Sequence, residues 1–404
     1  MNDYSSVFSN QRDPQPQPEP VECKEKQFDI GIPKEHLHNE TRIAVAEETL
    51  SDFSSLGYVT AIEKGAIQNE ERENIPKNLE EGIVLTDKKT VFSASIVLKI
   101  QPPTIEEAKL LRQGGILFSE IHHNCISKEL FHILQDKKIT WFNIWDICEP
   151  TTGYKPLKTL HQNAVATFVP YIIAHFTDRL PRKDRFPMGK TLARHAPVVK
   201  VVGYGDAAKN ATRLLSGLGY HVQVMTETVS SLQAVDREYD HFVEKSLFSP
   251  HTFFKDISNA SIVLFDLTNY CGEHFPLQRQ NIFQSSVSSL WIDLSRPFYP
   301  LMCDLQETTP SGFGKLSENV WYHSCENILS VVPDITAKQN GEILTCCFFR
   351  PFAKQRNISA FLSENPHLHS AIHFYNGNVC HRETAQRLNT NFHDLNFFRN
   401  SLLS

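Results

Sequence analysis

The feature that most constrains the fold of this chain is a strand–turn–helix–strand unit over residues 198–226, with two glycines in its first turn. The apolar run Val198–Val202 is typical of a buried parallel strand. It leads directly into Gly203-Tyr-Gly-Asp-Ala-Ala208, which has the G-x-G-x-x-A pattern of a dinucleotide-binding turn. A helix over about 207–218 and a second strand over 221–225 complete the unit. The pattern predicts an α/β domain built on a parallel sheet.

The residue types of this turn suit the pyrophosphate of a nicotinamide cofactor. Gly203 permits a tight turn, and Gly205 has no Cβ to block a phosphate. Ala208 lets the helix lie close to the strand, and the N–H groups of the first helical turn attract anions. We therefore predict that Gly203, Gly205, Ala207 and Ala208 bind NAD, with NADP not excluded, and that the protein is an oxidoreductase.

The end of the second strand departs from the usual dinucleotide pattern. An acidic residue that binds the ribose hydroxyls is expected there, but the chain has Thr226, followed by Glu227. We assign both to the cofactor site. A hydrogen bond to a charged group contributes about 1.5–3 kcal/mol, so its loss at Thr226 should weaken NAD binding. Asp206 adds a negative charge near the phosphates unless its side chain turns outward.

Composition excludes some classes of partner. The chain has 404 residues, a formal net charge of −6 and 41% hydrophobic residues, which is enough for two domains with a large core. An acidic balance argues against nucleic acid or an anionic membrane as the main partner. The nine cysteines form no C-x-x-C pair, and the polar start predicts no signal peptide. We therefore expect a cytoplasmic protein with free thiols.

Alternating strands and helices follow a predicted disordered tail of residues 1–26, which is rich in Pro and Gln. Their order implies a parallel sheet. The predicted strands are 27–32, 59–63, 96–100, 115–119, 139–142, 198–202, 221–225, 261–266 and 290–294. The predicted helices are 49–56, the stretch capped by Thr104, 127–135, 163–176, 207–218, 340–353 and 383–388. Residues 42–45 are predicted to be extended or to begin a helix, and residues 178–197 are predicted to form a connector. Residues 372–375 with Asn376-Gly377 are predicted to form a hairpin.

Six segments in sequence order resemble the alanine dehydrogenases and the related α-subunit of pyridine-nucleotide transhydrogenase. They are Ile30–Glu35 with Asn39–Val45, Val97–Pro103, Ile116–His122, the Gly203 turn, Trp321–Asn327 with Val332-Pro333, and Ile372–Asn389.

The resemblance implies two Rossmann-like domains with parallel sheets, the cofactor domain being inserted into a discontinuous substrate domain. The expected substrate domain is 27–158 with 338–404, and the expected NAD(P)-binding domain is 159–337. The family's chemistry is the reversible oxidative deamination of L-alanine, or a similar small amino acid, to a 2-oxo acid. The resemblance also implies a homo-oligomer, commonly a hexamer.

Three residues match functional positions of that family. Arg42 matches the arginine that binds the substrate carboxylate, for which a guanidinium supplies two parallel hydrogen bonds. His122 matches the active-site histidine, which can relay a proton near neutral pH. Asn327 lies in the late active-site segment and is assigned to substrate binding. Two neighbouring histidines, His122 and His123, without a third ligand do not make a metal site, and we predict none.

Other family positions are replaced. The catalytic lysine of the family falls at Gln101, and Lys99, two residues earlier on the same strand face, is the candidate to replace it. The active-site aspartate falls near Pro297, and a Ser-Glu pair of the middle helix appears as His161-Gln162.

Three hypotheses remain at this point. The first is an NAD(P)-dependent amino-acid dehydrogenase that resembles alanine dehydrogenase. The second is a reductase of the opine or saccharopine type, which joins an amine to a 2-oxo acid. The third is a non-catalytic paralogue that keeps the fold, which the replacements at Gln101, Pro297 and Thr226 favour.

Overall fold

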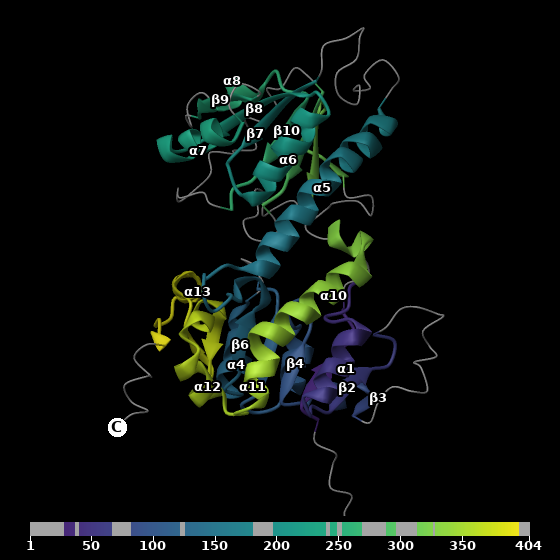
Figure 1. Cartoon of the computed structure of the whole chain (residues 1–404), viewed down its shortest axis with the longest axis vertical. Helices are drawn as coiled ribbons and strands as arrows, with labels where there is room; N and C mark the ends of the chain where they lie inside the picture. Colours follow the sequence, from purple (N-terminus) through teal and green to yellow (C-terminus); the bar gives the residue numbers. More distant parts are fainter. Residues whose placement is uncertain are drawn as a thin grey trace, which may run out of the picture.

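Two open α/β sheets organise the chain, and Figure 1 shows them as separate lobes. The computed structural model describes residues 28–36, 40–66, 82–121, 126–180, 197–239, 243–248, 253–268, 288–295, 313–325 and 328–395. One lobe contains the purple and blue N-terminal elements together with the yellow C-terminal ones. The other lobe is teal and green and comes from the middle of the chain.

The first sheet has eight strands in the order β15-β14-β6-β5-β4-β1-β2-β3. Their bounds are β1 Ile30–Ile32, β2 Thr60–Glu63, β3 Ile83–Thr86, β4 Ile96–Leu98, β5 Ile116–Ser119, β6 Thr140–Asn143, β14 Ile372–Tyr375 and β15 Asn378–Val379. From β1 the chain proceeds outward to β2 and β3, and from β4 it proceeds in the other direction to β5 and β6. The strand order therefore reverses between β1 and β4, where a crevice opens outside the carboxyl ends of the strands.

The second sheet has seven strands in the order β12-β13-β11-β10-β7-β8-β9 and repeats this arrangement. Their bounds are β7 Val198–Val202, β8 His221–Thr226, β9 Glu244–Leu247, β10 Ile262–Phe265, β11 Ser289–Asp293, β12 Phe313–Lys315 and β13 Val320–Ser324. Here the order reverses between β7 and β10, which are paired in parallel from Val199 with Ile262 to Val202 with Phe265. This second reversal lies beside the predicted glycine turn.

The expectation of parallel sheets is corrected at the edges. Strand β14 pairs antiparallel with β6 and β15, and β12 pairs antiparallel with β13. The hairpin β14–β15 turns at Asn376 and Gly377, with φ of 50° and 81°, which is the left-handed geometry that Asn-Gly favours. The fold remains two Rossmann-like units of mixed, mostly parallel sheets.

Helices connect and cover the strands. Their bounds are α1 Glu47–Ser55, α2 Lys88–Phe92, α3 Ile105–Leu110, α4 Lys128–Asp136, α5 Pro156–Arg179, α6 Asp206–Gly217, α7 Val229–Tyr239, α8 Phe253–Ile257, α10 Pro333–Leu344, α11 Arg350–Ala353, α12 Ile358–Glu364 and α13 Arg382–Leu388. Helix α3 begins with the predicted cap, in which Thr104 and Glu107 bind each other's backbone N–H groups. No helix in the described part of the chain is long and apolar enough to cross a membrane.

The long helices α5 and α10 run between the two lobes (Figure 1). The start of α5 packs on the first lobe through Leu157, and Val165 to Phe176 join the core of the second. The domain boundaries expected at 158/159 and 337/338 fall inside these two helices, and we propose them as the places where the lobes are joined.

Most predicted elements are present, with three informative differences. Residues 42–45 form neither strand nor helix, because Arg42 is held by side-chain contacts after β1. Helix α5 begins earlier than the predicted 163–176 because Pro156 lies in its first turn, where a missing backbone N–H costs nothing. Strands β3, β9, β12 and β13 were not predicted, since each is short and most lie at or next to a sheet edge. The connector predicted over 178–197 lies mostly outside the described residues.

Gly203 should be essential for the turn between β7 and α6. Its φ is +95°, and an added Cβ would lie 1.9 Å from the backbone oxygen of Asp266. Gly203→Ala should therefore lower the free energy of unfolding by at least about 2 kcal/mol. Gly217→Ala is the control, because a Cβ there meets nothing within 4 Å. Urea denaturation that shows equal stability for the two variants would contradict this account of the turn.

Candidate active site

The first strand reversal contains a buried carboxylate, Glu40, that gathers the neighbouring polar groups. Its Oε1 accepts hydrogen bonds from the backbone N and Nε of Arg42, at 3.0 and 2.8 Å, and from Ser330 Oγ at 3.0 Å. Its Oε2 accepts from Arg42 Nη2 at 2.6 Å and from Gln101 Nε2 at 2.8 Å. Glu40 thus joins the segment after β1, the end of β4 and the segment after β13.

Arg42, the predicted carboxylate ligand, lies fully buried between two glutamates. Besides Glu40, its Nη1 donates to Glu120 at 3.1 Å, and its side chain has 0% exposed area. These contacts use one N–H on each of the three guanidinium nitrogens, so among the described residues two of its five N–H groups have no protein acceptor. Burial alone would lower the pKa of Arg42, but Glu120 and Glu40 raise it above its ordinary value. Arg42 is therefore a fixed cation.

Glu35 and Lys99 form a second set of buried charges at the end of β4. Glu35 accepts hydrogen bonds from the backbone N of Ile100 and Gln101, at 2.6 and 3.1 Å. Lys99 Nζ lies 3.8 Å from Glu35 and 2.7 Å from Glu107 of α3. Lys99 thus binds the cap of α3 rather than Glu40, and we propose that it holds α3 to β4 instead of replacing the amine missing at Gln101.

Burial raises the pKa of Glu35 to about 7, against the opposing effect of Lys99. Burial also acts to raise the pKa of Glu40, but there the hydrogen bonds and charge of Arg42 prevail and lower it. Near neutral pH Glu40 is therefore ionised beside Arg42, whereas Glu35 is close to its own pKa. Perturbed pairs of this kind are typical of functional sites, although structural ion pairs produce them as well.

The second strand reversal contains the predicted dinucleotide turn. Gly203 and Gly205 connect β7 to α6, and Ala207 and Ala208 are completely buried in the first turn of that helix. Asp206 turns outward and pairs with Lys209 at 3.3 Å. The turn therefore has the strand–glycine–helix arrangement that the sequence predicts for a dinucleotide-binding turn.

Asp266, at the end of β10, lies directly against this turn. Its Oδ2 accepts a hydrogen bond from the backbone N of Ala208 at 2.8 Å. A Cβ added to Gly205 would lie 2.3 Å from the same oxygen. The space that Gly205 keeps open is therefore filled by the carboxylate of Asp266.

Two sets of contacts lie next to the strand reversals, one around Ser330 and one around Thr268. Ser330, in the 3-10 helix η4 (Ile328–Val331) that follows β13, binds Glu40, and its backbone oxygen accepts from Thr41 Oγ1 at 2.7 Å. Gln162 of α5 donates to Thr268 Oγ1 at 3.3 Å, beside Asp266. The first strand reversal therefore contacts the segment that follows β13, and the end of β10 contacts α5.

Other predicted site residues are placed as follows. Thr226 is buried, and its hydroxyl donates to the backbone oxygen of Thr228 at 3.3 Å, while Glu227 is exposed. His122 and Asn327 lie outside the described residues, as does Pro297.

Sequence reasoning missed Glu40 and Asp266. Glu40 stood within a quoted motif, and Asp266 ended a predicted buried strand, which is where ligand-binding residues of α/β sheets gather.

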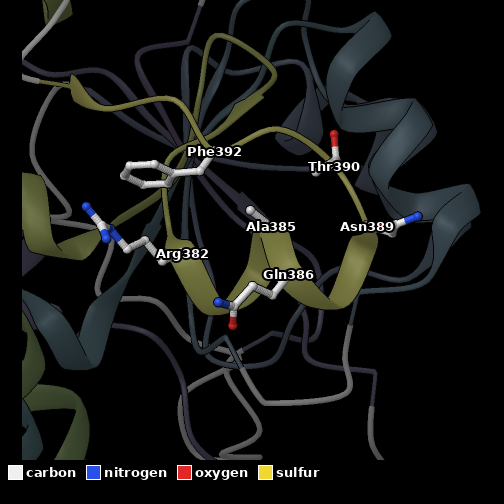
Figure 2. A pocket seen from close by; sticks show the side chains of 6 residues that line it. All are labelled: Arg382, Ala385, Gln386, Asn389, Thr390 and Phe392. Carbon is white, nitrogen blue, oxygen red and sulfur yellow. The ribbon is translucent and has the colours of Figure 1, made fainter.

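A separate hollow of about 380 Å³ lies at α13 near the C-terminus. Figure 2 shows its lining, with the Arg382 guanidinium 5.0 Å from the centre of the Phe392 ring. No residue that we predict to bind substrate or cofactor lines it, so the interface between the lobes remains the candidate site.

Comparisons with known proteins agree with this architecture. Residues 31–162 match the family model of the alanine dehydrogenase/PNT N-terminal domain. This match covers about a third of the chain, and that part is similar to the N-terminal domain of alanine dehydrogenases and transhydrogenases. It is 27% identical over 239 residues to alanine dehydrogenase of Bacillus subtilis (strain 168), covering 58% of this chain and 61% of that protein. It is 24% identical over 238 residues to alanine dehydrogenase of Methanococcus maripaludis, and this match covers 58% of this chain and 63% of that protein.

Two solved structures of the family share the fold. An L-alanine dehydrogenase superposes with a TM-score of 0.72 at 18% identity, covering 89% of this chain and 98% of that one. A transhydrogenase from Sinorhizobium meliloti superposes with a TM-score of 0.63 at 17% sequence identity, covering 87% of this chain and 99% of that one. The sequence matches span only about three fifths of the curated relatives. The chain has Gln101 at the position where the resemblance implies a catalytic lysine.

Arg42 should be the most costly cation to remove. Arg42→Met removes the cation that lies between the buried Glu40 and Glu120, which should lower the free energy of unfolding by about 3–5 kcal/mol, measured by urea denaturation. Arg42→Lys should lose less stability, because lysine keeps the positive charge but cannot form the several hydrogen bonds of the guanidinium to Glu40 and Glu120. The control is Arg213→Met, which breaks an ion pair whose arginine side chain is 65% exposed and should cost less than about 1 kcal/mol. Equal losses for the two methionine variants would contradict the account.

Glu35 should make stability fall as the pH rises. Its pKa is raised from 4.5 to about 7 in the folded chain, so between these values the folded state keeps a proton that the unfolded state has released. The difference in unfolding free energy between wild type and Glu35→Gln should therefore drop by roughly 3 kcal/mol from pH 4.5 to 7. A difference that stays constant or grows with pH in denaturation experiments would be inconsistent with a neutral buried Glu35.

Proposed function

We propose that this chain is an oxidoreductase that uses a nicotinamide dinucleotide to interconvert a small amino acid, such as L-alanine, and its 2-oxo acid. The observation that carries the proposal is that both sheets reverse their strand order beside the expected ligand residues, with Arg42 held by Glu40 at one reversal and the Gly203–Gly205 turn at the other. Dinucleotide and substrate sites of α/β enzymes lie at such reversals. NAD is the expected cofactor, and NADP is not excluded.

Arg42 is the residue for the substrate carboxylate. Glu40 holds its Nε and Nη2 with both oxygens, at 2.8 and 2.6 Å, which fixes the plane of the guanidinium. The two remaining N–H groups then have a set direction, and a carboxylate gains two parallel hydrogen bonds without ordering a flexible side chain. Glu40 is a positioning residue in this proposal.

Proton transfer is the step for which the chain is least equipped among the described residues. Gln101 donates to Glu40 at 2.8 Å but has no proton to exchange near neutral pH. His122, predicted from the sequence, is our candidate for this role. A nicotinamide cofactor, when bound, would accept or supply the hydride.

A second candidate is a non-catalytic family member that keeps the fold. The observation in its favour is that the chain's own carboxylates lie at both expected anion positions, Glu40 on Arg42 and Asp266 on the glycine turn. In that case neither ligand would bind.

Cofactor-coupled turnover separates the two candidates. NADH absorbance is followed with pyruvate and ammonium, and NAD reduction with L-alanine. The proposal predicts turnover in both directions, and a KM for pyruvate that rises at least tenfold in Arg42→Lys while the KM for NADH changes less than threefold. Absence of turnover and of pyruvate binding at millimolar concentrations would favour the non-catalytic candidate.

Gln101→Lys should restore the missing amine. The new ammonium would lie within reach of Glu40, which now binds the Gln101 amide. Because a positioned general acid or base contributes about 10²–10⁴ in rate, turnover should rise by at least about tenfold. Gln101→Met is the matched control, with similar length and no charge, and should not raise it. Unchanged turnover in the lysine variant would show that this position does not limit the reaction.

A further inference from the structure

Asp266 is held firmly in the dinucleotide turn by its neighbours. Its carboxylate accepts hydrogen bonds from the backbone N of Ala208 at 2.8 Å, from Thr268 Oγ1 at 2.5 Å and from Thr268 N at 3.3 Å. The residue is 1% exposed. These contacts make its position a defined feature of the fold.

The position of this carboxylate coincides with the opening that the glycine provides. A Cβ on Gly205 would lie 2.3 and 2.4 Å from the two oxygens of Asp266, and a Cβ on Gly203 would lie 1.9 Å from its backbone oxygen. Both glycines are therefore needed already to accommodate Asp266. A phosphate at the same helix terminus would meet a negative charge in a buried place, where repulsion is strong.

The arrangement extends to the helix that joins the lobes. Gln162 Nε2 of α5 donates to Thr268 Oγ1 at 3.3 Å, and the Thr268 hydroxyl donates in turn to Asp266. Close by, Asn210 of α6 donates to Asn163 Oδ1 of α5 at 2.5 Å. The contacts of Asp266 thus depend on how α5 lies against α6.

We infer that Asp266 is an internal anion that closes the glycine turn to the phosphates of a dinucleotide and so sets the affinity of this chain for its cofactor. The inference rests on the proposed function, because it concerns the same turn. When a dinucleotide binds, the carboxylate leaves Ala208 and the phosphate takes over that N–H group. A nucleoside without phosphates does not compete with it.

Calorimetric titration of purified full-length protein with NADH, and separately with adenosine, tests this. Asp266→Ala should bind NADH at least tenfold more tightly than wild type, while adenosine affinity changes less than twofold. Thr268→Val, which removes one support of the carboxylate, should show a smaller gain. Asp206→Asn is the control for charge alone, because Asp206 is ion-paired and its side chain is 43% exposed, and it should change NADH affinity less than threefold.

Several results would overturn the inference. Asp266→Ala could bind NADH no more tightly than wild type. Its affinity for adenosine could rise as much as its affinity for NADH, or Asp206→Asn could gain as much NADH affinity as Asp266→Ala. If Asp266→Ala does not fold, the NADH affinities of Asp266→Asn and Thr268→Val are compared with wild type instead, and affinities no tighter than wild type overturn the inference. Because the readout is binding, a variant that gains NADH affinity without turnover supports this inference while contradicting the proposed function.

Discussion

The carboxylate of Glu40 is the interaction on which the candidate site depends. It accepts five hydrogen bonds, three from Arg42 and one each from Gln101 and Ser330, and these partners come from three separate parts of the chain. A buried charge left without such partners costs several kcal/mol, so the segment after β1 must remain irregular in order to supply them. Arg42 owes its fixed position to this network.

The fold gives this network a counterpart in the other lobe. Both sheets reverse their strand order, between β1 and β4 and between β7 and β10, and polar residues gather at the strand ends there. Glu40 meets Arg42 at the first reversal, and Asp266 meets the glycine turn at the second. Each place that could bind an external anion thus already contacts an internal one. Glu40 and Asp266 therefore set the electrostatic surroundings that an anionic ligand would meet at either reversal.

Much of the fold could be predicted from sequence because local signals were strong. The run Val198–Val202 with its glycines, the Thr104 cap and the Asn376-Gly377 hairpin each have a local physical cause. The site was less predictable. Arg42 and Gln101 were found by resemblance, but their shared partner Glu40 depends on how β1 and β4 pair. Asp266 reaches Gly205 across 61 residues, a contact that no local pattern indicates.

Amide hydrogen exchange measured by mass spectrometry, with and without several millimolar NADH plus pyruvate, tests most directly whether both strand reversals bind ligands. We predict slower exchange in two peptides at once, one that contains Ile100 and Gln101 and one that covers Gly205 to Lys209. Peptides from α13, beside the separate hollow, should not change. Unchanged exchange in both site peptides, or protection confined to α13, would contradict the account.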